Sequence, residues 1–353
     1  MKNLILSFFF GLIAIFTYSQ QQKGTIVVER INAPSLQNSA GEDPVRRVTI
    51  YLPPGYKEST KRYPVIYFLH GFWWSDSLMI AQDHFDQVLD KAIQSGKIKP
   101  VILVMPNENN QYRGSFYTNS SLTGNWADFT AKELVSYIDT HYRTIASKNS
   151  RGVSGHSMGG HGAIKMGMLF PEVFSCVYAL SPAVLALGLE NGPYSNAFKN
   201  LAKYKTSEQL LNSNEFMPIA SIAMGRAYSP NPDKPPFYCD LPFSYKGDSI
   251  IVDYKTLELW ENNSPLYMAG KYAANLRKLK AIKFDWGRND EFQHIPSTCH
   301  MFSLRLESLA IPHYAEEYIG SHGSKIMTED GRVLNEMLPF FDKWLEFAET
   351  IKP

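Results

Sequence analysis

A serine with a glycine two residues before it and another two residues after it is the strongest chemical feature of this chain. It stands in the run Gly155-His156-Ser157-Met158-Gly159, between a short strand expected at 152–154 and a helix expected at 157–170. A tight strand-to-helix turn of this kind lifts the serine hydroxyl above a sheet, and the glycines let neighbouring backbone approach closely. Such a run occurs by chance about 0.1 times in a chain of this length, at roughly 7% for each residue type. The pattern therefore predicts a nucleophilic serine; an ordinary glycine-rich turn is the alternative.

A second run, His70-Gly71-Phe72, follows the apolar stretch 65–69 directly. In a sheet enzyme with such a serine, the loop after an early strand supplies one backbone N–H to the oxyanion, and the residue after the nucleophile supplies the other. We therefore assign the oxyanion hole to the N–H groups of Phe72 and Met158. We expect His70 to be structural, because the order in such enzymes is serine, then acid, then histidine.

Elements that could position these residues alternate along the chain. Short continuous apolar runs, typical of strands buried on both faces, are separated by stretches with helical periodicity. This alternation predicts an α/β fold with a mostly parallel central sheet and helices on both faces. The expected strands are 25–31, 47–52, 65–69, 101–105, 152–154, 173–180, 281–286 and 313–319, and the expected helices are 85–94, 128–142, 157–170 and 331–347.

The alternation stops at residues 182–270, which we call the insertion segment. We expect it to lie over the carboxyl ends of the strands, above Ser157, where ligands of open α/β sheets bind. Its aromatic residues Phe237 and Tyr245, together with Trp126, are candidates for substrate binding. A purely structural packing role is the alternative for each.

Several motifs together resemble the putative-esterase family of α/β-hydrolases, which includes feruloyl esterases, S-formylglutathione hydrolases of the esterase D type, trilactone siderophore esterases and antigen 85 mycolyltransferases. The resemblance extends over roughly residues 47–346 and is weak in the insertion segment. It implies an α/β-hydrolase fold and ester chemistry without a cofactor. The runs that carry it are Leu69-His70-Gly71, Gly124-Asn125-Trp126, Glu133-Leu134, Tyr137-Ile138-Asp139, Tyr142-Arg143-Thr144 and Gly155 to Gly160.

The acid and the histidine should follow late strands. The family's spacing of a glycine, two residues and an aspartate implies Asp290 after Gly287, with Glu291 as the next candidate. His322 lies between the last expected strand and the final helix, where the base belongs. His300 and His313 are the alternatives for the base.

Composition excludes several other classes of protein. The chain has 353 residues, 35 Lys and Arg against 34 Asp and Glu, and a formal net charge of +1, which does not suit a nucleic-acid-binding protein. No histidine, cysteine or carboxylate spacing indicates a metal site. Cys239 and Cys299 could form a disulfide, whereas Cys176 lies in an apolar run. The oligomeric state is left open.

The first residues predict export. Lys2, a short apolar run at 4–16 and the small residues Thr17 and Ser19 are typical of a signal peptide at 1–19, which would leave a single domain at 20–353 in a secreted or periplasmic protein without a stable membrane anchor. An uncleaved anchor is the alternative. We expect an exported serine esterase acting on feruloyl or acetyl esters of carbohydrate. A siderophore lactone esterase or a sugar acyltransferase is the alternative function. An inactive relative that binds carbohydrate or protein is the non-enzyme alternative.

Overall fold

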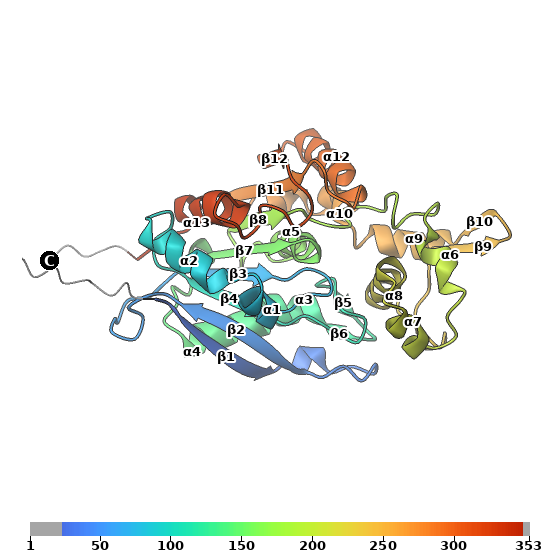
Figure 1. The fold of residues 1–353 in the computed structure, drawn as a ribbon, viewed down its shortest axis with the longest axis horizontal. Helices are drawn as coiled ribbons and strands as arrows, with labels where there is room; N and C mark the ends of the chain where they lie inside the picture. Colours follow the sequence, from blue (N-terminus) through green and yellow to red (C-terminus); the bar gives the residue numbers. More distant parts are fainter. Residues whose placement is uncertain (1–22, 349–353) are drawn as a thin grey trace, which may run out of the picture.

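A large central sheet organises the protein (Figure 1). The structure, a computed structural model, describes residues 23–348, so the expected signal peptide lies outside the described residues. Within them, eight strands pair in the order β1-β2-β4-β3-β7-β8-β11-β12, and β2 runs antiparallel to β1 and β4 while the remaining pairs are parallel. These strands are β1 (Thr25–Asn32), β2 (Val45–Leu52), β3 (Val65–Leu69), β4 (Ile102–Pro106), β7 (Arg151–His156), β8 (Cys176–Leu180), β11 (Ala281–Gly287) and β12 (Tyr314–Tyr318).

Helices cover both faces of this sheet because its central strands are apolar on both sides. All five residues of β3 are buried: Val65, Tyr67 and Leu69 face one core, while Ile66 and Phe68 face the other. The first core lies against α3 (Trp126–Asp128), the π-helical η2 (Phe129–Glu133), α4 (Leu134–His141), α5 (Met158–Leu169), α10 (Pro265–Lys271), α11 (Ala273–Leu276) and α12 (His294–Ser308). The second lies against α1 (Asp76–Ala81), α2 (Phe85–Gln94), the π-helical η4 (Val333–Met337) and α13 (Leu338–Trp344). The predicted α/β architecture is confirmed.

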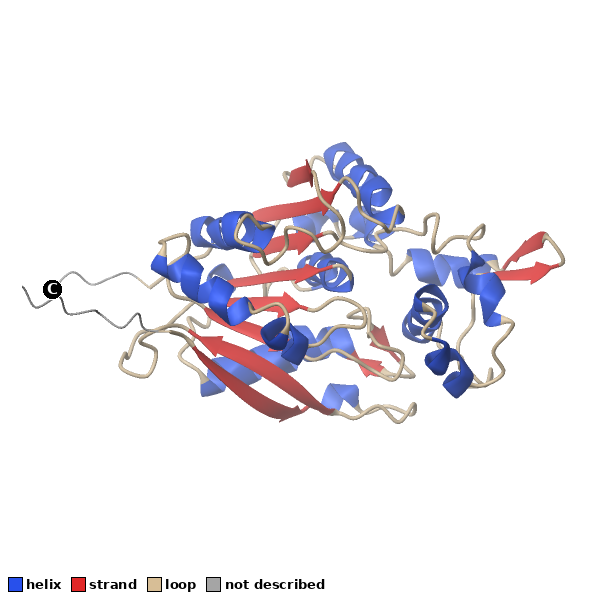
Figure 2. Ribbon diagram, viewed as in Figure 1, coloured by secondary structure: helices blue, strands red, loops and turns tan. Residues whose placement is uncertain are grey.

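Most of the insertion segment lies beyond the ends towards which the parallel strands point, as the strand arrows in Figure 2 show. It is mainly helical and carries one small hairpin. Its elements before α10 are α6 (Asn196–Leu201), α7 (Ser207–Ser213), α8 (Phe216–Tyr228), β9 (Phe243–Lys246), β10 (Ser249–Val252) and α9 (Tyr254–Glu261). The other short elements of the chain are η1 (Pro34–Leu36), β5 (Asn119–Ser120), β6 (Gly124–Asn125) and η3 (Lys148–Ser150).

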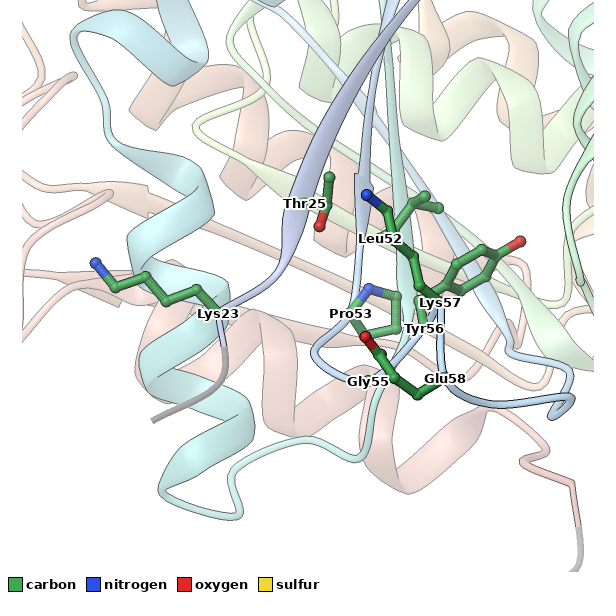
Figure 3. Close-up of a pocket in the computed structure, with 8 residues that line it drawn as sticks. All are labelled: Lys23, Thr25, Leu52, Pro53, Gly55, Tyr56, Lys57 and Glu58. Carbon is green, nitrogen blue, oxygen red and sulfur yellow. The ribbon is translucent and has the colours of Figure 1, made fainter. Parts of the chain in front are cut away.

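A hollow of about 120 Å³ lies at the opposite edge of the sheet (Figure 3). It is formed where β1 begins and β2 ends. Since β2 is antiparallel to β4, this is the edge at which the parallel strands begin. The hollow is therefore remote from Ser157 and takes no part in the site described below. Its lining residues are Lys23, Thr25, Leu52, Pro53, Gly55, Tyr56, Lys57 and Glu58.

None of the helices between residues 23 and 348 is long and apolar enough to cross a membrane. The described residues also hold no group of three or more histidine, cysteine or carboxylate side chains that could bind a metal ion.

Candidate active site

Ser157 stands at the sharp turn between β7 and α5. Its backbone has φ +59° and ψ −118°, an unusual conformation for a residue other than glycine, and such strain concentrates at functional sites. The flanking glycines allow the close approach that this turn requires. A Cβ on Gly155 would lie 2.4 Å from the Gly159 oxygen, and a Cβ on Gly159 would lie 1.9 Å from the Leu69 oxygen. The serine is thus held at the carboxyl edge of the sheet by the packing of α5 against β3 and β7.

The loops after β11 and β12 bring an aspartate and a histidine together. Asp290 is fully buried, and its Oδ2 accepts a hydrogen bond from Nδ1 of His322 at 2.8 Å. Its Oδ1 accepts from the Phe292 N–H at 2.9 Å, so the carboxylate is held at both oxygens. Because Nδ1 carries the proton, Nε2 of His322 is left as the free base. This is the arrangement in which a carboxylate fixes the tautomer of a general base.

The other candidates for acid and base lie elsewhere. Glu291 accepts from the backbone N–H of His322 at 2.8 Å and does not bind the ring. Asp285 lies inside the sheet with Arg332 and Tyr178. His313 bonds with Ser303, and His300 with Glu317.

His156, next to Ser157, supports the histidine loop. Its Nε2 donates to the His322 carbonyl at 2.8 Å, and the two rings lie 4.6 Å apart. Burial lowers the pKa of His156 to about 3, so this ring stays neutral beside the base. Among the hydrogen bonds of the described residues, none joins Ser157 to His322. Such bonds often tighten only when substrate binds.

The backbone N–H groups of Phe72 and Met158 have no hydrogen-bond acceptor among the described residues, and the same holds for Gly159 and Gly160 in the first turn of α5. The loop that carries Phe72 passes close to the nucleophile, since a Cβ on Gly71 would lie 3.4 Å from the Ser157 Cβ. Met158 opens α5, where the first N–H groups lack intrahelical partners. Free donors beside a serine suit a developing oxyanion.

His70 holds the loop that carries Phe72. Its Nε2 accepts from the Glu108 N–H at 2.8 Å, so Nδ1 carries the proton and donates to the Gly71 carbonyl at 2.8 Å. Burial lowers the pKa of His70 to about 4, which keeps the ring neutral. His70 is therefore built into the fold and faces the backbone on both sides of its ring.

Ser157 opens into two hollows. The first, called the large cavity, has a volume of about 530 Å³. The second, called the small cavity, has a volume of about 30 Å³. The large cavity is lined by Phe68, His70, Gly71, Phe72, Trp74, Met79, Gln82, Asp83, His84, His156, Ser157, Phe216, Phe292, His322, Gly323, Ile326, Met327 and Thr328. The small cavity is lined by Phe72, Phe116, Ser157, Met158, Ala183, Val184, Phe216, Met217, Ala220, Met224, Phe292 and His294.

The three predicted substrate-binding aromatics are not among the residues that line either cavity. Trp126 is fully buried: Nε1 donates to the Thr123 carbonyl, and the Arg46 guanidinium covers its ring. Tyr245 belongs to the β9–β10 hairpin and donates to the Pro193 carbonyl at 2.7 Å. Phe237 packs within the insertion segment, where its carbonyl accepts from Arg226. All three stabilise the fold.

The insertion segment contributes a different helix to the site. Phe216, Met217, Ala220 and Met224 of α8 line the small cavity, and Phe216 also lines the large one. Sequence reasoning missed these residues because residues 218–228 of α8 are all buried, so no polar face marks the side that faces the site. Phe292, two residues after Asp290, was missed as well. Its closeness to the expected acid was the available indication.

The disulfide considered between Cys239 and Cys299 is absent from the described residues. Cys176, Cys239 and Cys299 are all buried free thiols. Cys239 lies in the insertion segment beside Gly225, whereas Cys299 lies on α12 in the core. Each fills space as a small apolar side chain does.

Comparisons with known proteins agree with this fold. The sequence profile of the putative esterase family matches residues 40–326, and the chain belongs to this family. It is 35% identical over 122 residues to the esterase Rv1288 of Mycobacterium tuberculosis, covering 33% of this chain and 25% of that protein. It is 32% identical over 142 residues to an endo-1,4-beta-xylanase/feruloyl esterase of Xylanibacter ruminicola, covering 37% of this chain and 18% of that protein. The chain thus spans a quarter or less of the length of these two relatives.

Solved structures share the α/β-hydrolase fold. A ferulic acid esterase superposes with a TM-score of 0.63 at 20% identity, covering 92% of this chain and 100% of the other. An S-formylglutathione hydrolase from Agrobacterium tumefaciens superposes with a TM-score of 0.60 at 16% identity, covering 92% of this chain and 96% of the other. These likenesses concern the fold.

Proposed function

We propose that the protein is an exported serine carboxylic-ester hydrolase, acting on feruloyl or acetyl esters of carbohydrate. One observation carries the proposal: the strained Ser157 and His322, whose ring is held by the buried Asp290, line the same large cavity, beside the Phe72 and Met158 N–H groups, which have no acceptor among the described residues. Family membership supports ester chemistry, and the relative whose name joins xylanase and feruloyl esterase supports carbohydrate-linked substrates. The expected signal peptide supports export.

In this proposal, Ser157 Oγ attacks the ester carbonyl and passes its proton to Nε2 of His322. Asp290 keeps Nδ1 protonated and stabilises the imidazolium that forms. The N–H groups of Phe72 and Met158 bind the oxyanion of the tetrahedral intermediate. His322 then protonates the leaving alcohol, and the acyl group remains on Ser157. Water, deprotonated by His322, releases the acid and regenerates the serine.

The test is hydrolysis of 4-nitrophenyl acetate by the purified protein and by Ser157→Ala. We expect the substitution to lower kcat by at least about a thousandfold, because the three residues act as a unit. A serine-directed fluorophosphonate should label the wild type at Ser157, as read by peptide mass spectrometry. Ser297→Ala, at an exposed position of α12 outside both cavities, is the matched control and should keep full activity. Retention of more than about a tenth of the turnover by Ser157→Ala would refute the assignment of the nucleophile.

A further inference from the structure

The two cavities meet at Ser157 but differ in which catalytic group they contain. His322 lines the large cavity and is not among the residues that line the small one. Nε2 of His322 has to reach the oxygen of the departing alcohol in order to protonate it. The alcohol must therefore leave on the His322 side, in the large cavity. The carbonyl substituent is then directed to the other side of Ser157, into the small cavity.

We propose that the small cavity holds the acyl substituent and that Phe216 restricts it to the size of an acetyl group. The preferred substrates are then acetyl esters of a bulky polar alcohol. This inference rests on the proposed ester hydrolysis at Ser157 and selects between its two acyl types.

The volume of the small cavity sets the limit. A water molecule needs about 10–15 Å³ of free cavity volume. The small cavity, at about 30 Å³, equals about two to three such sites. A methyl group beyond the ester carbonyl fits there, whereas a phenylpropenoyl group does not. The lining is mostly apolar, as at Ala183, Val184 and Met217, and suits a methyl group; its polar side chains are those of Ser157 and His294.

Phe216 is a fixed part of this wall because aromatic rings hold it on several sides. It stacks on Trp73 with centroids 5.9 Å apart and planes 7° apart, and on Phe292 at 5.3 Å and 29°. It meets Phe72 edge to face at 5.3 Å. Each such pair is worth about 0.5–1.5 kcal/mol beyond the buried area. The ring therefore stays between the two cavities unless this stack is broken.

The large cavity has the size and polarity for the alcohol. Its volume of about 530 Å³ lies within the range of small-molecule sites. Gln82, Asp83, His84 and Thr328 contribute hydrogen-bonding groups to its lining, and Trp74 adds an aromatic ring. Trp74 Nε1 donates to Asp83 Oδ2 at 2.8 Å, which holds these two side chains together. Such a mixture suits a polyhydroxylated alcohol.

The test compares 4-nitrophenyl acetate, butyrate and cinnamate, which share one leaving group. For the wild type we expect kcat/KM to fall at least about a hundredfold from acetate to butyrate, since each added methylene in a closed pocket changes the rate about 10–200-fold. Phe216→Ala should raise the butyrate-to-acetate ratio of kcat/KM about tenfold or more. Met224→Ala enlarges the same cavity from further along α8 and should raise this ratio too, which covers the case in which Phe216→Ala fails to fold.

Phe237→Ala is the matched control, because it removes an aromatic ring of the insertion segment that touches neither cavity; its ratio should equal that of the wild type. Hydrolysis of cinnamate within about tenfold of acetate by the wild type, or unchanged ratios in both cavity variants, would overturn the acyl limit while leaving the ester hydrolase intact. If no ester in the series is cleaved in a Ser157-dependent way, the proposed function fails, and the acyl limit fails with it.

Discussion

At the scale of single residues, His70 links the fold to the proposed chemistry. The Gly71 carbonyl and the Phe72 N–H belong to one planar peptide and point in opposite directions. By holding this carbonyl, His70 fixes the direction of the N–H that we assign to the oxyanion. His70 is thus a positioning residue, consistent with the structural role expected from its place before the serine in the chain.

Substitution of His70 by alanine should lower kcat for 4-nitrophenyl acetate about 10–100-fold, because loss of an oxyanion donor altogether costs about 10²–10³. KM should change by less than about threefold, since the carbonyl is bound weakly before it becomes an oxyanion. Steady-state kinetics separates the two parameters. A rise in KM with unchanged kcat would show that His70 shapes the binding site instead.

Glu108 adds a buried acid behind His70. Thr130 Oγ1 lies within hydrogen-bond distance of both Glu108 Oε1 and the Trp126 carbonyl. The hydroxyl has one proton, and the carbonyl can only accept it, so a protonated Glu108 completes the network. Burial raises the pKa of Glu108 from 4.5 to about 7.

The folded-state pKa of Glu108 lies above the unfolded value. The contribution of its protonated carboxyl to the free energy of unfolding is therefore fully present below pH 4.5 and is lost as the pH rises through about 7. Glu108→Gln mimics the protonated form. Its free energy of unfolding, relative to that of the wild type, should increase as the pH is raised from 5 to 8. The gain should be on the order of 3 kcal/mol, at about 1.4 kcal/mol per pKa unit. Urea unfolding at both pH values measures it. Glu172→Gln, at an exposed position, should show the same pH dependence of unfolding free energy as the wild type. The same pH dependence in Glu108→Gln would contradict the prediction.

At the scale of elements, the strands of the sheet could be predicted from the sequence. The helices and the hairpin within the insertion segment could not. The strands β3, β4 and β8 are short apolar runs buried on both faces, so local composition marks them, and the observed β3 and α2 have the predicted bounds. Ser157 and His322 could be predicted because chain order and strand ends restrict their positions, and Asp290 because the family's spacing implies it after Gly287. The structure joins Asp290 and His322 by a hydrogen bond, and their catalytic roles stay predictions. Phe237 and Tyr245, the substrate-binding candidates of the insertion segment, belong to a loop and to the β9–β10 hairpin and line neither cavity.

The contact between α5 and β3 makes its own prediction. Gly159→Ala places a methyl group against the Leu69 backbone, and backbone atoms cannot give way as a flexible side chain does. We expect a loss of at least about 1–3 kcal/mol in unfolding free energy, together with loss of activity, because the helix that presents Ser157 has to shift. Thermal unfolding measures the loss. Gly323→Ala, where no atom lies within 4 Å of the added carbon, should leave the midpoint unchanged. A stable Gly159→Ala protein would contradict the proposed close packing.

At the scale of the whole molecule, the formal charge is nearly balanced. With 35 basic and 34 acidic residues, long-range steering by charge is weak, so selection among substrates falls to the shape of the cavities. The insertion segment supplies half of the lining of the small cavity, mostly through α8, whereas Phe216 is its one residue in the lining of the large cavity.

The expected signal peptide gives a prediction at the amino terminus. We expect the mature protein to begin near Gln20, because Thr17 and Ser19 are small residues at the positions that a signal peptidase reads. N-terminal sequencing of the secreted or periplasmic protein measures this. An intact Met1 in the membrane fraction would favour the uncleaved anchor.

The three buried thiols have a consequence for how this protein can be followed in solution. Burial raises the pKa of Cys176 to about 11 and that of Cys239 to about 12, so neither forms a thiolate at neutral pH. Alkylating reagents should then modify each cysteine only when its surroundings open. Cys239 lies in the insertion segment, whereas Cys176 lies on β8 in the sheet. The labelling rate of Cys239 therefore reports the opening of the insertion segment, and the labelling rate of Cys176 reports the unfolding of the sheet.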